Sequence, residues 1–63
     1  MRLLVNMINP TQNDIGRKVV YRDWDGPEDG VITGVTLEFV MVRYGNDQWS
    51  KAARHEDLEW MAK

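Results

Sequence analysis

The chain contains no cysteine, so it can form neither a disulfide nor a thiolate metal site. Its 63 residues lie near the lower limit of what one hydrophobic core can stabilise unaided. We therefore expect one small domain whose stability comes from tight β-packing or from self-association. The lack of cysteine also fits a reducing cytoplasm.

A surplus of positive charge and a long apolar run are also missing. Ten acids outnumber eight Lys and Arg, which gives a net charge of −2. Nucleic-acid binding through phosphates usually needs a basic surplus, so here it would need a local basic patch. The first residues, MRLLVNMI, are too few to span a bilayer and lack a cleavage site. We expect a cytoplasmic protein without a membrane partner, whose translation starts at Met1 or Met7.

Two β-rich runs, residues 31–35 and 39–44, form the apolar centre of the chain, and Gly30 and Gly45 bracket them. A glycine inside the first run, Gly34, predicts a bulge or bend. Alternation along the second run separates a core face from an outward face that carries Phe39, Met41 and Arg43. The predicted core face of this hairpin consists of Val31, Val35, Val40, Val42 and Tyr44.

The remaining segments predict further short elements. Residues 17–22 (RKVVYR) predict a strand, and residues 23–30 (DWDGPEDG) predict an acidic loop. Thr11 and Asp14 have the spacing of a capping box that opens one helical turn. Residues 1–8 predict an apolar arm or an extra strand.

The C-terminal segment leaves two alternatives open. It has the propensity of a helix over residues 51–61, but Ala53, Leu58 and Trp60 do not fall on one helical stripe. We favour a strand over residues 50–54, a helical turn over 55–57 and a strand over 58–61, with Trp60 in the core. The predicted fold is therefore all-β, a five-stranded barrel over residues 15–63 preceded by an arm and short turn over residues 1–14.

The order of these elements resembles an SH3-like barrel of the Tudor or KOW kind. The sequence segments that carry the resemblance are IGRKVVY at 15–21, EDGVITGV at 28–35, FVMVRYGN at 39–46 and EDLEW at 56–60. The same segments, in the same order, resemble those of a group of short, uncharacterised phage and prophage proteins. The resemblance implies an SH3-like fold and a setting in the bacterial host cytoplasm.

The sequence offers little for catalysis or for metal and cofactor binding. His55 is the only histidine, and we expect it on an exposed helical turn with only Ser50 as a nearby hydroxyl. The run Asp23–Trp24–Asp25–Gly26 resembles the start of a calcium loop but lacks the later ligands. We expect no enzyme, no cofactor and no metal.

Two binding functions remain. The first is protein binding through apolar side chains at outward or loop positions, a surface that could equally form a homodimer. The predicted partner-binding residues are Trp24, Phe39, Met41 and Trp49. The alternative is nucleic-acid binding through a local patch of cations interleaved with aromatics. The residues predicted for that patch are Arg17, Lys18, Arg22, Lys51 and Arg54.

Overall fold

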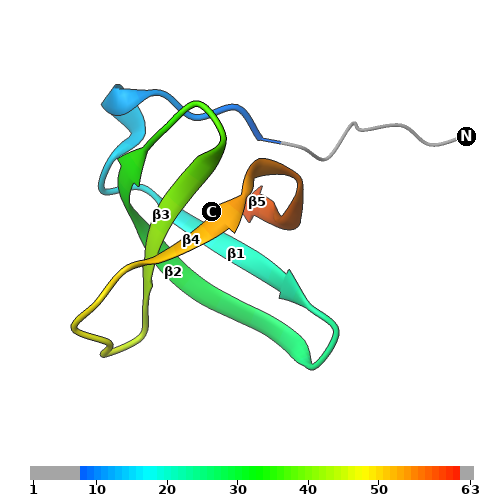
Figure 1. Cartoon of the computed structure of the whole chain (residues 1–63). Coiled ribbons are helices and arrows are strands. Elements are labelled where there is room, and N and C mark those ends of the chain that lie inside the picture. The colour runs from blue at the N-terminus through cyan, green and yellow to red at the C-terminus, as the bar shows by residue number, and fades with distance from the viewer. Residues whose placement is uncertain (1–7, 62–63) are drawn as a thin grey trace, which may run out of the picture.

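The structure is a computed structural model that describes residues 8–61 apart from the side chain of Asp23. In this range it contains five strands and two single 3₁₀ turns, and it has no helix longer than these turns (Figure 1). In chain order the elements are η1 (Gln12–Asp14), β1 (Lys18–Asp23), β2 (Gly26–Val35), β3 (Phe39–Tyr44), β4 (Lys51–Arg54), η2 (His55–Asp57) and β5 (Leu58–Trp60). The all-β prediction is confirmed. The arm predicted over residues 1–7 lies outside the described residues.

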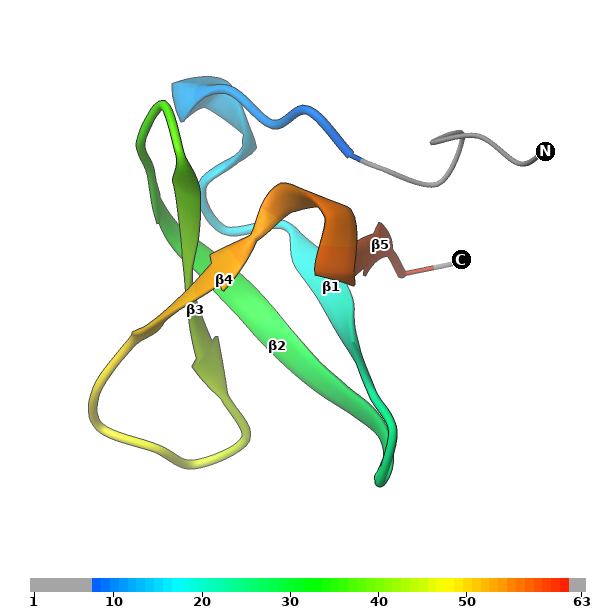
Figure 2. The same ribbon diagram turned by 45° about the vertical axis from the view of Figure 1, so that its right-hand side comes forward.

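The strands form one antiparallel sheet in the order β4-β3-β2-β1-β5. The sheet bends strongly, so that β4 and β5 lie on the same side of the β1–β2 hairpin (Figure 2). No pairing joins β4 to β5 within residues 8–61, and these two strands are the edges of the sheet.

The C-terminal alternatives are resolved in favour of strands. β4, η2 and β5 occupy the segment that a continuous helix would have filled. Leu58 is fully buried and Glu59 is exposed, while Trp60 is half-buried and packs against the core. This alternation is the period of a strand rather than of a helix.

The predicted loop over residues 23–30 is wrong, because β2 already begins at Gly26. Only Trp24 and Asp25 remain in the turn, and Gly26 follows with a φ of 122° that favours glycine. Pro27 pairs with Arg22 in a stretch where β2 has β1 as its only neighbour. A proline is tolerated there because the strand lacks a second ladder to which its nitrogen would have to donate.

The predicted bulge is confirmed, but it overturns the prediction that Val31 is a core residue. The register between β2 and β3 shifts between Ile32 and Gly34, which leaves Thr33 as the extra residue. An extra residue reverses the alternation, so Ile32 points inward before the bulge and Val35 after it. Val31 lies on the outer face instead.

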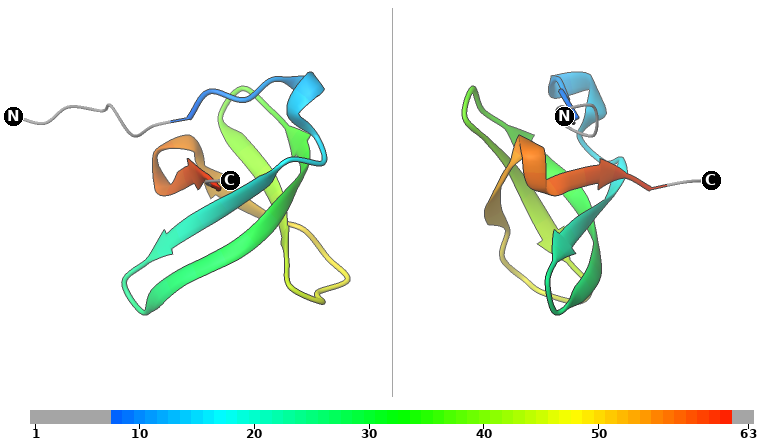
Figure 3. Two further views of the ribbon diagram at one scale, coloured as in Figure 1. Left: turned by 180° about the vertical axis from the view of Figure 1, so that it is seen from behind. Right: turned by 90° about the vertical axis from the view of Figure 1, so that its right-hand side faces the viewer.

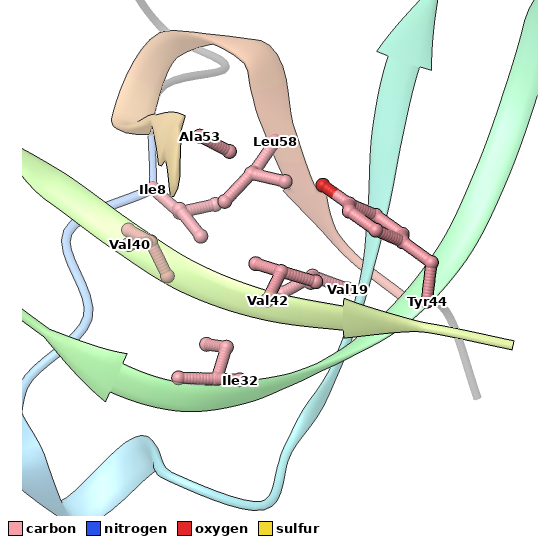
Figure 4. Close-up of a cluster of buried hydrophobic side chains, with 8 residues drawn as sticks. All are labelled: Ile8, Val19, Ile32, Val40, Val42, Tyr44, Ala53 and Leu58. Carbon is pink, nitrogen blue, oxygen red and sulfur yellow. The ribbon is translucent and has the colours of Figure 1, made fainter. Parts of the chain in front are cut away.

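The core lies inside the bend and draws on both ends of the described chain (Figure 4). Val40, Val42 and Tyr44 are buried as predicted. Ile8 joins them from the segment that precedes η1. The buried apolar residues are Ile8, Val19, Ile32, Val40, Val42, Tyr44, Ala53 and Leu58.

Candidate binding surfaces

Two tryptophans project from loops at one end of the molecule. Trp24 occupies the two-residue turn between β1 and β2 and is 98% exposed, and Trp49 lies in the loop between β3 and β4 and is 76% exposed. Both loops lie at the end of the sheet that is opposite η1 and the β2–β3 turn (Figures 1 and 3). They stand apart from each other on either side of that end (Figure 2).

A hollow of about 240 Å³ lies between the strands that carry these loops. Tyr21 and Glu28 line it from the β1–β2 hairpin, and Tyr44 and Lys51 flank the β3–β4 loop. The rings of Tyr21 and Tyr44 meet edge to face, with centroids 6.1 Å apart and planes at 66°. We name the two indoles and this hollow the tryptophan end.

Burial raises the pKa of the Tyr44 phenol in this hollow. Desolvation of its phenol, together with the nearby carboxylate of Glu28, raises the pKa of Tyr44 to about 12. The hydroxyl, which is protonated at neutral pH even at the usual pKa of 10.0, therefore keeps its proton to higher pH and can donate a hydrogen bond. The hollow combines aromatic rings with one acid and one lysine.

The other two predicted partner-binding residues lie elsewhere, on the outer face of β3. Phe39 is 39% exposed and stands opposite Arg54 in β4. Met41 is half-buried and stands opposite Gly34 in β2. β3 begins at the end of the sheet that is opposite the tryptophan end (Figure 1). The structure thus places the four residues on two surfaces rather than one.

Three of the five predicted nucleic-acid-binding cations are used in internal contacts. Arg17 pairs with Asp14 at 3.0 Å and stacks 3.9 Å from the ring centroid of Trp60. Arg22 pairs with Glu59 at 3.0 Å and donates to the main-chain oxygen of Glu56.

Arg54 completes this set of paired arginines. It contacts Glu56 at 3.2 Å and Asp57 at 3.5 Å. Lys18 and Lys51 have no ion-pair partner within residues 8–61, and they lie on different faces, Lys51 in the hollow and Lys18 on the outer face. The five cations therefore do not form one patch.

His55 lies on the predicted helical turn but is half-buried rather than exposed. Its Nε2 atom is buried and has no hydrogen-bond partner among the described residues. Across residues 8–61, no group of His, Asp or Glu side chains is placed to hold a metal ion.

The sequence does not predict four residues of the hollow as site residues: Tyr21, Glu28, Tyr44 and Ala52. Glu28 lies in β2 opposite Tyr21 rather than in the loop that the sequence predicts, and these two residues are the most informative of the four. Tyr21 could have been found from alternation, because it shares its face with Val19 at the centre of the core. Without the long β1–β2 pairing, no local signal brings these two residues to Tyr44.

Comparisons of the chain with protein-family models, with curated proteins and with solved structures find no match. Within the described residues, no helix has the length and apolar character required to cross a membrane.

Proposed function

We propose that this chain is a non-enzymatic protein-interaction module that binds its partner with the tryptophan end. The observation that carries the proposal is the exposure of Trp24 and Trp49 on either side of a tyrosine-lined hollow. Trp and Tyr are enriched among the few residues that carry most of the binding energy of protein interfaces. A partner that covers both loops would also enclose the hollow.

The pairing of the cations makes protein a better partner than nucleic acid. Arg17, Arg22 and Arg54 would each have to give up an internal carboxylate to contact a phosphate. The net charge of −2 further opposes a polyanion.

We further propose that the fold is an SH3-like barrel and that the protein is phage or prophage encoded and acts in the host cytoplasm. Two features support the barrel. The strand order is β4-β3-β2-β1-β5, and the long strand β2 pairs with β1 on one side and, around a bulge, with β3 on the other. The proposal of a phage origin rests on the order of the sequence segments from IGRKVVY to EDLEW. Phage genes flanking the coding sequence would support it, and a chromosomal setting without them would contradict it.

The binding site can be tested by affinity capture from a bacterial lysate with matched variants. We expect Trp24→Ala and Trp49→Ala each to lose the partner that the wild type retains. Leu37→Ala is the control, because Leu37 is 95% exposed but lies in the β2–β3 turn at the opposite end. Retention by both tryptophan variants, or equal loss with Leu37→Ala, would contradict the assignment.

Measured affinity for oligonucleotides separates the two classes of partner. The protein-binding proposal predicts no salt-dependent binding of single- or double-stranded oligonucleotides. Tight binding that weakens steeply with salt would favour the nucleic-acid alternative instead.

A further inference from the structure

A second pocket lies on the outer face of the sheet, away from the tyrosine hollow. It has a volume of about 230 Å³ and is lined by Lys18, Asp29, Gly30, Val31, Arg43, Gly45 and Met61. Four of these residues form a row across neighbouring strands. Lys18 pairs with Val31 and Val31 with Arg43, while the Met61 nitrogen donates to the Lys18 oxygen at 3.2 Å.

Side chains of directly paired residues point to the same face of an antiparallel sheet. Lys18 and Arg43 therefore flank Val31 on the outer face. Neighbouring strands are about 4.8 Å apart, so the two cations start about 10 Å from each other across Val31. Their side chains are long enough to meet over one small anionic group placed on Val31.

These two cations differ from the arginines described above, because neither has an ion-pair partner within residues 8–61. Asp29 lines the pocket beside Lys18 but does not form a salt bridge with it. Gly45 contributes no side chain, so the pocket stays open to solvent beside Arg43. The pocket thus holds two cations that form no ion pair and one carboxylate, which leaves one net positive charge over an apolar floor.

We propose that this pocket binds the carboxylate of an Asp or Glu side chain on an extended, otherwise apolar segment of a partner protein. Arg43 and Lys18 hold the carboxylate, and Val31 and Met61 contact the neighbouring apolar side chains. Because Asp29 also lines the pocket, the lining carries only one net positive charge, which favours a single carboxylate over a run of phosphates. The site is distinct from the tryptophan end and does not depend on it.

The proposal is tested by titrating the isotope-labelled protein with a short capped peptide that carries one Glu between valines. We expect amide shifts at Lys18, Val31, Arg43 and Met61, and none at Trp24 or Trp49. The same peptide with Gln in place of Glu should bind about tenfold more weakly, because it loses the charge-assisted hydrogen bonds. Lys18→Gln and Arg43→Gln should each weaken binding of the Glu peptide by about tenfold.

Arg54→Gln is the matched control, because it removes one positive charge outside the pocket. It should leave the affinity for the Glu peptide unchanged. Equal binding of the Glu and Gln peptides, or no binding of either, would overturn the proposal. Stronger binding of inorganic phosphate or of a single-stranded oligonucleotide through the same amides would overturn it as well, since it would make the pocket a phosphate site.

Discussion

Gly30 lies against the core at a point where no side chain fits. A Cβ atom built on Gly30 would stand 2.4 Å from a methyl carbon of Val42 and 2.8 Å from the ring of Tyr44. Both neighbours are buried and belong to β3, so they cannot move away without disturbing the core. The need for glycine here is one of space.

We predict that Gly30→Ala lowers the free energy of unfolding by about 2 kcal/mol through overpacking. Gly34→Ala is its control in the same strand. A Cβ there would make ordinary contacts of 3.6 Å with Met41, so this variant should unfold within about 0.5 kcal/mol of the wild type. Urea denaturation of both variants measures the difference, and equal midpoints would refute the steric explanation.

The buried phenol of Tyr44 predicts a loss of stability in strong alkali. Its pKa rises from the usual 10.0 to about 12 on folding, so the folded state holds the proton more tightly than the unfolded state. The stability that this proton contributes is complete below pH 10 and is lost as the pH rises through about 12. Between these limits we expect a loss of about 2 kcal/mol.

Denaturation in urea over this pH range tests the origin of the effect. The Tyr44→Phe variant should lack the part of the alkaline loss that Tyr44 causes, while other groups titrate as before. An unchanged slope in Tyr44→Phe would show that a different group is responsible. Phenolate absorbance of the folded wild type should likewise show one tyrosine that ionises late.

At the scale of elements, η1 fastens the start of the chain to the sheet. Its capping box is confirmed: the Thr11 nitrogen donates to Asp14 at 2.8 Å, and the Thr11 hydroxyl accepts from Asn13. Gln12 reaches across to the Val35 oxygen at 2.9 Å. Arg17 then joins Asp14 to the Trp60 ring.

Asp14→Asn should destabilise the protein and reduce its sensitivity to acid. The main-chain donor of Thr11 and then the guanidinium of Arg17 lower the pKa of Asp14 below its usual 3.8. A lowered pKa means that the stability from Asp14 is present above pH 3.8 and is lost as the pH falls through the folded value. Melting temperatures of both proteins at neutral and acidic pH measure the effect. A difference that does not shrink in acid would contradict it.

Sequence reasoning recovered the elements that carry a local signal. β3, η2 and the η1 capping box follow from alternation, propensity and side-chain spacing. The sequence does not predict the start of β2, because Gly and Pro usually mark a loop and only pairing with β1 makes Pro27 acceptable in a strand. The prediction for Val31 is wrong because a bulge shifts the alternation by one residue, and the sequence does not show which residue is the extra one.

The candidate sites were less predictable, because they depend on contacts between distant segments. Exposure of Trp24 and Trp49 follows from their loops and could be predicted. The tyrosine hollow requires β1, β2, β3 and β4 to meet, and the outer-face pocket requires the register of β1, β2 and β3 together with Met61, which follows β5. The internal pairing of Arg17, Arg22 and Arg54 also lies beyond the reach of a sequence pattern.

At the scale of the whole molecule, a single core joins the first and last described elements. Ile8 precedes η1, whereas Leu58 opens β5, and both belong to one buried cluster with the hairpin valines (Figure 4). A domain of this size has few kcal/mol of stability to lose, because it buries a smaller fraction of its surface than a larger domain does. A core substitution near either end of the described chain should therefore destabilise the whole sheet.

We predict that Leu58→Ala and Ile8→Ala each lower the free energy of unfolding by about 3 kcal/mol and unfold the sheet as one unit. Asn9→Ala is the control, because Asn9 is exposed beside Ile8 and should change stability by less than about 0.5 kcal/mol. Amide hydrogen exchange measures the extent of the effect. Protection in β2 and β3 should fall together with protection in β5, because the hairpin has no apolar cluster of its own apart from this core. A hairpin that stays protected in either variant would show that it is stable without the ends, and that the core is not cooperative.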